Sequence, residues 1–474
     1  MRRLLLFFPL LLLLAAGACA TLPDIHPWTE EATRGRAIPT VIGARGELPP
    51  EKAKALLQRL AAQGKGSDLL ARHIAIEEEL AGAPLTAGND VTLLHDGPAT
   101  YRAMFDAIAR AQDHVNLEFY IIEDDEVGRR FSDALIAKRR EGVAVHLIYD
   151  SVGSLGTPRA FFERLRAAGV AVLEFNPVNP LKARRGWQVN QRDHRKMLIV
   201  DGRVAFTGGI NISGVYSSAP SRGRGGSSAS GGSGLGSGPS RDPRAAGWRD
   251  TNLRIAGPGA AALQQLFLAT WQRQGGPPLP DRRWFPPLTP AGDQFVRILG
   301  STPDDTLPAI YAAYVSAIRT AEKSVRLTMA YFVPDAQTMD VLTAAAQRGV
   351  EVTLVLPSYT DFWAVFHAGR SHYAMLLASG VRIYERQDAL LHAKTAVIDG
   401  VWSTVGSSNL DWRSFLHNDE VNAVVLGPRF GDEMERMFAR DVAASREITL
   451  AAWQARPLAT RMKERAARVW EYWL

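Results

Sequence analysis

The sequence predicts an α/β fold made of two similar halves, each an α/β/α sandwich with a mixed, mostly parallel sheet, related by a pseudo-twofold duplication. Short runs rich in β-branched residues alternate with helix-like segments, as in sheets whose parallel strands are connected by helices. The same alternation returns in the second half of the chain. A polar motif also occurs once in each half.

Length and composition are those of a folded protein with two ordinary domains. The chain has 474 residues, of which 46% are hydrophobic and 22% charged, and its net charge is +6. This balance excludes an intrinsically disordered chain, whereas the small positive charge alone does not identify a partner. The single cysteine, Cys19, excludes a disulfide within the chain, and no metal-ligating cluster is evident, so we expect neither metal nor cofactor.

Residues 1–19 have the pattern of a secretory signal. Two arginines precede an apolar run at 4–14 that is too short for a confident membrane span. The following AGAC, at 16–19, resembles a bacterial lipobox, which implies lipidation of Cys19 and a membrane anchor on the mature protein. Ala20 after the cysteine favours the outer membrane, facing the periplasm of a bacterial envelope. An ordinary cleaved signal peptide is the alternative.

The rest of the chain divides where the alternation of strands and helices begins and ends. Residues 20–90 are expected to form a polar tether and a helical segment without recognisable chemistry. The first half spans 91–275 and contains a Gly/Ser-rich insertion at 217–240, which we expect to be a flexible surface loop. Proline and glycine mark a linker at 276–294, and the second half spans 295–474.

The repeated motif contains a histidine, a lysine two residues later and an aspartate five residues after the lysine. Its two copies are His194, Lys196 and Asp201, and His392, Lys394 and Asp399. Strand-like residues follow each lysine, and glycine follows each aspartate, which predicts a hairpin turn. Because side chains alternate along a strand, the histidine and lysine of each copy should face one side. Chance rarely repeats such a pattern in register, which favours an active site over two buried core histidines.

A glycine-containing loop follows each copy of the motif and ends in an asparagine, Asn211 in the first half and Asn409 in the second. Backbone amides in such loops are natural donors to an anion. The motif and its loop therefore predict a site for a negatively charged substrate.

These residues resemble the phospholipase D superfamily, and most closely its bacterial cardiolipin synthase-like members, over about residues 95–455. The resemblance rests on HRKMLIVDG with TGGIN, on LHAKTAVIDG with GSSNLDWRS, and on LEFYIIEDDEVGRR, YDSVGS, YFVPD, WRD at 248–250 and HNDE at 417–420. It implies two phospholipase D-like halves with one active site between them, in a monomer. The insertion ahead of WRD and the lipoprotein-like start are departures, since many cardiolipin synthases carry membrane-spanning helices.

The resemblance implies a role for each polar residue of the motif. A phosphodiester is an anion with a poor alkoxide leaving group, so its site must offer positive charge, a nucleophile and an acid. His194 would form a phosphohistidine, and His392 would serve as general acid and base. The groups that would bind the nonbridging phosphate oxygens are Lys196, Lys394, Asn211 and Asn409.

Four carboxylates complete the predicted site. The resemblance points to Asp250 in WRD and Glu420 in HNDE as the groups that orient the histidines. Asp201 and Asp399 belong to the motif and are counted in its catalytic set. Their place after the strand nevertheless suits fixing the hairpin turn and strand pairing better than contact with substrate.

Four functions remain open at this point. The first is a membrane-anchored phosphatidyltransferase that makes cardiolipin from phosphatidylglycerol, with phosphatidylethanolamine as a possible further substrate. The second is a phospholipase D that hydrolyses phospholipids to phosphatidic acid through the same intermediate. A nuclease of the superfamily fits less well, because an envelope lipoprotein rarely meets nucleic acid. A non-catalytic lipid-binding lipoprotein is disfavoured by the intact motif in both halves.

Two aromatic stretches in the second half have alternative interpretations. The C-terminal RMKERAARVWEYWL is basic and aromatic, which fits either a helix at an anionic membrane surface or a helix that caps the second half. The aromatic residues at 362, 363 and 366 either line an entrance for acyl chains or fill the core.

Overall fold

The computed structural model describes residues 21–25, 27, 39–62, 72–75, 78, 82–179, 181, 187–188, 190–218 and 247–473. The predicted signal sequence with Cys19, and residues 219–240 of the predicted insertion, lie outside the described residues. Across the part of the chain that is described, no helix is long and apolar enough to cross a membrane.

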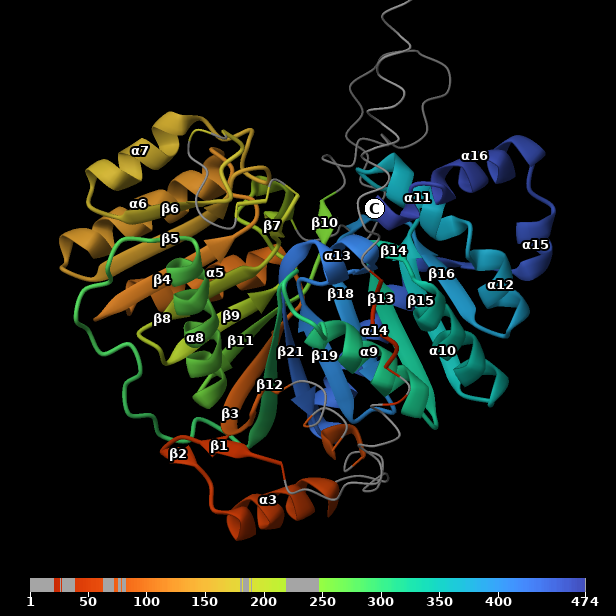
Figure 1. The fold of residues 1–474 in the computed structure, drawn as a ribbon, viewed down its shortest axis with the longest axis horizontal. Helices are drawn as coiled ribbons and strands as arrows, with labels where there is room; N and C mark the ends of the chain where they lie inside the picture. Colours follow the sequence, from red (N-terminus) through yellow and green to blue (C-terminus); the bar gives the residue numbers. More distant parts are fainter. Residues whose placement is uncertain are drawn as a thin grey trace, which may run out of the picture.

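The first half alternates strands and helices and then forms a hairpin before its last helix (Figure 1). Its elements are β3 (Leu85–Leu94), α5 (Gly97–Ala109), β4 (His114–Phe119), α6 (Glu126–Arg140), β5 (Ala144–Asp150), α7 (Arg159–Ala167), β6 (Ala171–Phe175), β7 (Arg192–Asp193), β8 (Lys196–Val200), β9 (Val204–Gly208), η2 (Gly214–Tyr216), β10 (Trp248–Arg249), β11 (Asn252–Ala256) and α8 (Pro258–Arg273). Strand β3 thus begins before the expected boundary at residue 91.

The second half follows the same order of strands and helices. Its elements are β12 (Gln294–Ser301), α9 (Ala309–Thr320), β13 (Ser324–Met329), β14 (Phe332–Val333), α10 (Ala336–Gln347), β15 (Glu351–Pro357), α11 (Trp363–Arg370), α12 (Tyr373–Ala378), β16 (Arg382–Arg386), β17 (Leu390–Leu391), β18 (Lys394–Ile398), β19 (Trp402–Gly406), β20 (Leu410–Asp411), α13 (Trp412–Leu416), β21 (Asn418–Leu426), α14 (Pro428–Ala443), β22 (Ser445–Ile448), α15 (Leu450–Gln454), α16 (Leu458–Arg468) and η3 (Glu471–Trp473).

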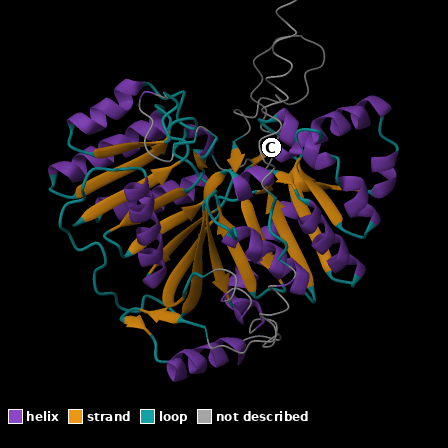
Figure 2. Ribbon diagram, in the orientation of Figure 1, coloured by secondary structure: helices purple, strands orange, loops and turns teal. Residues whose placement is uncertain are grey.

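One continuous sheet runs through both halves, with helices on its faces (Figure 2). From one edge inward the first half is ordered β6-β5-β4-β8-β9-β11-β3, and the second half has the equivalent order β16-β15-β13-β18-β19-β21-β12, with β22 added antiparallel on the outer side of β16. Strands β3 and β12 pair antiparallel at the centre. This arrangement confirms the predicted α/β class and the pseudo-twofold duplication.

Within these two strand orders, parallel pairing occurs among the outer three strands of each half: β4 with β5 and β5 with β6, and β13 with β15 and β15 with β16. The inner strands are antiparallel, because β8 and β18 each return through a tight hairpin to β9 and β19. The sheet is therefore mixed, as expected, and its parallel pairs form the two flanks.

Capping side chains explain where several helices begin. Asp96 and Asp125 accept hydrogen bonds from the first turns of α5 and α6, and Asp335 does the same for α10. Such N-caps satisfy backbone donors that have no partner within the helix. Helices α8 and α14 instead each begin at a Gly-Pro pair, where proline lacks the donor that would otherwise need a partner.

The cores join the halves as well as filling them. One cluster of buried apolar residues combines α8 and α14 with strands from both halves, including Phe267, Met434, Ile199 and Val397. Burying side chains of this size stabilises the fold by roughly 1.5–3 kcal/mol each. Separating the halves would expose this cluster, so the two halves are expected to fold as one unit.

The N-terminal segment is not only a tether. The predicted helix is present as α3 (Pro50–Ala62), and β1 (Val41–Gly43), which pairs with the two-residue strand β2 (Gly46–Glu47), also extends the sheet by pairing with β3. Val41 and Leu60 are buried in the core of the second half. This long-range packing is not visible in local apolar spacing, which is why the sequence did not predict it.

Candidate active site

Short strand pairs between the halves bring the two histidines together. His194 follows β7, which pairs with β21 of the second half, and its backbone N–H donates to the carbonyl of Asp419 (2.9 Å). His392 follows β17, which pairs with β10 of the first half, and its backbone N–H donates to the carbonyl of Arg249 (2.8 Å). Both imidazoles line one pocket of about 380 Å³.

The carboxylates that orient the histidines are exchanged between the halves. Nδ1 of His194 lies 3.0 Å from Oε1 of Glu420, and Nδ1 of His392 lies 2.7 Å from Oδ2 of Asp250. Each carboxylate therefore holds the histidine of the opposite half. With Nδ1 engaged in this way, Nε2 is the nitrogen that each ring presents to a substrate.

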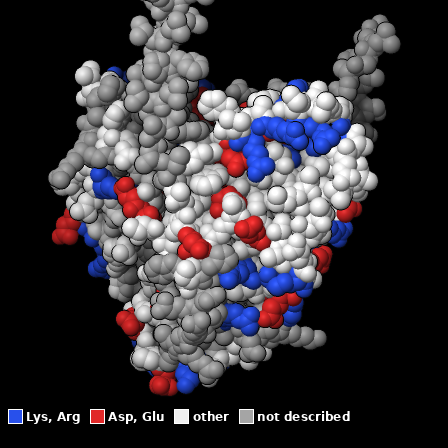
Figure 3. Space-filling model, turned by 45° about the vertical axis from the view of Figure 1, so that its right-hand side comes forward, with Lys and Arg blue, Asp and Glu red and all other residues white. Residues whose placement is uncertain are grey.

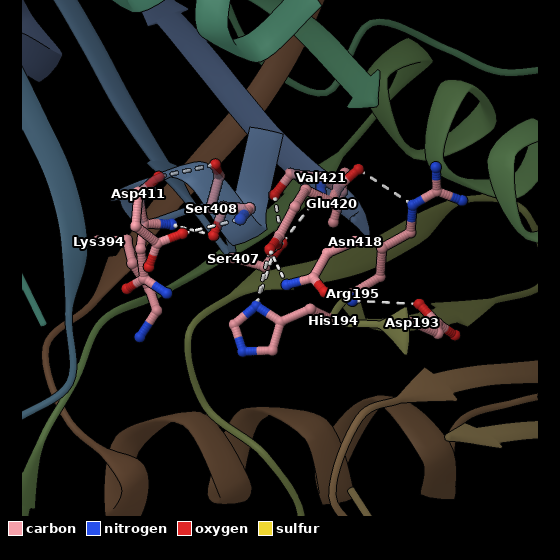
Figure 4. Close-up of polar contacts among 12 residues, drawn as sticks. Asp193, His194, Arg195, Lys394, Ser407, Ser408, Asp411, Asn418, Glu420 and Val421 are labelled. Atoms are coloured by element: carbon pink, nitrogen blue, oxygen red, sulfur yellow. Dashed lines mark hydrogen bonds and ion pairs between the residues drawn. The ribbon is translucent and has the colours of Figure 1, made fainter. Parts of the chain in front are cut away.

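Glu420 is itself held in place by several donors. Its carboxylate accepts hydrogen bonds from the Ser407 hydroxyl and from the side-chain amide of Asn418 (3.2 Å). Figure 4 shows these side chains and His194 directed at the same carboxylate. Such a network limits the rotation of the imidazole, so the orientation of the ring is fixed before a substrate arrives.

Electrostatics favour a neutral His194 beside an ionised Glu420. Burial lowers the pKa of His194, and the Glu420 carboxylate offsets only part of that effect. Burial alone would raise the pKa of Glu420, but His194, Lys196 and Ser407 outweigh it and lower the pKa. The Nδ1–H of a neutral imidazole would thus point at Glu420, which leaves the Nε2 lone pair available for attack.

The second histidine has more negative charge around it. Burial lowers the pKa of His392, and Lys394 lowers it further, whereas the carboxylates of Asp250 and Asp361 both raise it. Asp361 lines the pocket and has no place in the repeated motif. His392 is therefore the ring with two carboxylates to stabilise a proton.

The two motif lysines are buried beneath the histidines, each 1% exposed. Their ammonium groups donate to the backbone carbonyls of His194 and His392, and neither lysine is among the residues that line the pocket surface. Burial lowers the pKa of Lys196 to about 7 and of Lys394 to about 8. The lysines thus supply positive charge from the pocket floor, and a bound phosphate would stabilise their protonated forms.

The two predicted asparagines line the pocket in equivalent places. Oδ1 of Asn211 accepts a hydrogen bond from the backbone N–H of Ile121 (3.1 Å), and Oδ1 of Asn409 accepts one from Tyr331 (3.3 Å). Since the carbonyl end of each side chain is anchored, the NH₂ end is the part that can donate to a phosphate oxygen. In Asn211 one N–H of this group already donates to the Tyr216 hydroxyl (3.2 Å), which leaves the other for a ligand.

Asp201 and Asp399 lie away from the pocket, at the other end of β8 and β18, roughly 16 Å along a strand of five residues at about 3.3 Å each. Asp201 accepts hydrogen bonds from the backbone N–H groups of residues 112–114, and Asp399 accepts them from residues 322–324. Both occupy the left-handed region, with φ of 52° and 54°, at the expected hairpin turns. These contacts fit the expected part of both aspartates in the hairpin turns, and their assignment to the catalytic set stays a prediction.

Several pocket residues were missed in the sequence. Tyr120, Trp248 and Tyr331 line the pocket, as does Arg413 of α13. All four lie in stretches that carry the family resemblance, but their spacing along the sequence assigns them no role. Phe362 also lines the pocket and is 49% exposed, which favours the entrance over the core for this aromatic residue.

The C-terminal segment packs on the second half, as one of the two interpretations made for it expects. Helix α16 packs on α11 through buried Ala467, which joins a small core with Val365. The ring of Tyr472 packs against Trp412 of α13, with centroids 5.6 Å apart. Trp470 nevertheless remains 57% exposed, so the segment caps the second half and still presents apolar surface to solvent.

Comparison with known proteins places this geometry in a family. A family model described as cardiolipin synthase, PLD-like domain, matches residues 104–217 and 314–442. The cardiolipin synthase of Geobacillus thermodenitrificans is 34% identical over 389 residues, which cover 81% of this chain and 72% of the relative. The major cardiolipin synthase ClsA of Bacillus subtilis is 33% identical over 393 residues, which cover 82% of this chain and 76% of the relative.

A solved structure supports the fold. The crystal structure of phosphatidylserine synthase from Haemophilus influenzae superposes with a TM-score of 0.60 over 89% of this chain and 100% of that chain, at 12% sequence identity. The predicted resemblance is confirmed by the family model and by the relatives. The chain therefore belongs to the cardiolipin synthase family of phospholipase D-like enzymes.

Proposed function

We propose that this enzyme transfers a phosphatidyl group between phospholipids through a phosphohistidine and makes a cardiolipin-type lipid. The observation that carries the proposal is the pair of histidines in one pocket, each held at Nδ1 by a carboxylate of the opposite half. A binding protein would have no need of two imidazoles with matched orienting groups above two buried lysines. Relatives named cardiolipin synthases support the choice of lipid substrates.

In the first step, Nε2 of His194 attacks phosphorus while the bond from phosphorus to the head-group oxygen breaks. The leaving oxygen takes the proton from Nε2 of His392, so a neutral alcohol departs. Lys196, Lys394 and the amide donors stabilise the negative charge on the nonbridging oxygens. In the second step, His392 removes a proton from an incoming alcohol, whose oxygen attacks phosphorus and releases His194.

The charge around the two rings supports this order of roles. His194 has a single carboxylate, Glu420, and its pKa is lowered, which suits a nucleophile that must be neutral. Burial and Lys394 lower the pKa of His392 as well, but two carboxylates, Asp250 and Asp361, oppose that lowering, which suits a group that must begin as an acid better than a ring beside one carboxylate does.

We also propose that the enzyme works on the bacterial envelope membrane with an anchor at Cys19, in the outer membrane facing the periplasm. Exposed apolar side chains support contact with a membrane on the side of the pocket. They lie after β5, β6 and β15 and on the C-terminal segment: Val152, Leu155, Val178, Leu181, Phe362, Trp363, Leu458, Met462, Val469 and Trp470.

Basic residues of α16 fit the same orientation. Its exposed cations are Arg461, Lys463, Arg465 and Arg468. Figure 3 shows Lys and Arg side chains gathered along the top of this face of the molecule. Such a surface complements anionic lipid, so removal of Cys19 should weaken membrane attachment without abolishing binding to phosphatidylglycerol vesicles.

Product analysis by mass spectrometry tests the activity. The full chain in detergent micelles would be given phosphatidylglycerol, with and without phosphatidylethanolamine, and His194→Ala would serve as the control. Cardiolipin and released glycerol that require His194 would support the transferase. Phosphatidic acid alone would identify a phospholipase D, and an absence of any lipid product would reject both.

A further inference from the structure

The pocket is symmetric at its floor and asymmetric in its walls. Phe119 pairs with Lys196, and Met329 pairs with Lys394, so Ile121 and Tyr331 occupy equivalent positions two residues further along. Their backbone N–H groups make the same contact, one to Asn211 and the other to Asn409. The side chains at these positions differ, since one is aliphatic and the other carries a hydroxyl.

The next loop of each half repeats the contrast. After β5, the pocket is lined by Val152 and Gly153, whereas after β15 it is lined by Asp361 and Phe362. The hydroxyl of Tyr331 donates to Oδ1 of Asp361 (2.7 Å), which joins the two polar groups into one unit. At these equivalent positions the first half contributes apolar groups and the second half contributes a carboxylate, although Tyr120 and Arg192 of the first half also line the pocket.

The polar wall is on the side of His392. The rings of Tyr331 and His392 meet edge to face with centroids 6.4 Å apart. In the proposed reaction, His392 protonates the leaving alcohol and later deprotonates the incoming one. Both alcohols must therefore pass through the space between His392 and this wall.

We propose that Tyr331 and Asp361 form the head-group subsite, and that it selects alcohols carrying a second hydrogen-bond donor, either another hydroxyl or an ammonium group. The inference rests on the proposed function, because the head group is the leaving group of that reaction. An ionised carboxylate only accepts hydrogen bonds, so it would bind an alcohol that offers a second donor, such as a glycerol hydroxyl or an ethanolamine ammonium. A simple alkyl alcohol would leave the carboxylate without a new partner.

Competition between alcohols tests the subsite. The full chain in micelles of phosphatidylglycerol would receive equal concentrations of glycerol, ethanolamine and 1-propanol, and mass spectrometry would give the ratio of the phosphatidyl products. We expect the wild type to favour glycerol and ethanolamine over 1-propanol by about 10-fold or more, as for other sites that bind a second polar group.

The variants separate the two kinds of donor. Asp361→Asn should lower the ethanolamine-to-propanol ratio by about 10-fold and the glycerol-to-propanol ratio by only about 3-fold, because the charge is lost while an acceptor oxygen remains. Tyr331→Phe should produce a smaller change in both ratios. Asp293→Asn, an exposed carboxylate in the linker that pairs with Arg429 (3.1 Å), is the matched control and should leave both ratios unchanged.

Unchanged ratios in Asp361→Asn, or an equal loss with all three alcohols, would overturn the subsite while leaving the transferase intact. A wild type that forms no phosphatidyl product with any alcohol would instead reject the proposed function, and the subsite with it.

Discussion

The two halves of the protein share a scaffold but differ around the pocket. Each half contributes a histidine, a buried lysine and an asparagine from equivalent strands, and each contributes the carboxylate that orients the other half's histidine. The walls differ, because the first half lines the pocket with Ile121 and Val152 where the second half has Tyr331 and Asp361. Duplication gives each half the same catalytic groups, whereas the proposed reaction needs one neutral and one protonated imidazole. The different loop residues give the two histidines different surroundings.

The sharpest way to break the equivalence is to remove each histidine in turn. His194→Ala and His392→Ala should both lower lipid turnover by at least about 10³-fold. With a p-nitrophenyl phosphodiester, whose leaving group needs no acid, only His392→Ala should still accumulate a covalent phosphoenzyme. Intact-protein mass spectrometry would detect it. An adduct in His194→Ala but not in His392→Ala would reverse the assigned roles.

Substituting each buried lysine in turn compares what the two halves contribute to phosphate binding. Lys196→Met and Lys394→Met should each lower kcat/KM by about 10²–10³-fold, since each removes a positive charge near the developing negative charge. Steady-state kinetics on micellar phosphatidylglycerol would measure the effect, with circular dichroism to verify folding. If kcat/KM fell in only one of the two variants, the lysine of a single half would be the one that binds the phosphate.

The exchanged carboxylates should have smaller effects that differ with pH. Glu420→Gln and Asp250→Asn should each lower kcat by about 10–100-fold, because each leaves an imidazole without its orienting partner. Asp250 raises the pKa of His392, so its removal lowers that pKa. His392 would then lose its proton at a lower pH than in the wild type. The alkaline limb of the profile of kcat against pH should therefore shift to lower pH. Glu420→Gln should not move that limb in the same direction.

The turn aspartates should affect stability rather than catalysis. Asp201→Ala and Asp399→Ala each leave backbone N–H groups without an acceptor, at a cost of about 1–3 kcal/mol. Asp399 is 8% exposed and Asp201 is only partly buried, so Asp399→Ala should be the more destabilising change. Chemical denaturation would compare the two variants. Activity per folded molecule should stay within about 3-fold of the wild type, since neither side chain lines the pocket.

Local features of the sequence predicted much of this molecule. The alternation of strands and helices predicted the duplicated α/β fold, and Asp-Gly after each strand predicted hairpins whose residues do adopt positive φ. The spacing of His194 and Lys196, repeated at His392 and Lys394, predicted the floor of the pocket. These features depend on contacts between near neighbours, so the order of residues is sufficient to read them.

Other features depend on contacts between distant parts of the chain, and only the tertiary structure decided them. Glu420 is 226 residues from His194, and Asp250 is 142 residues from His392, so no local pattern could show that the carboxylates are exchanged between the halves. The same is true of the pairing of β1 with β3 and of the wall formed by Tyr331 and Asp361. The sequence by itself determined which chemical groups the protein has and how each local element forms. Packing of the two halves on one sheet determined which groups meet, because the pocket is lined by both halves and each histidine is held by a carboxylate of the other half.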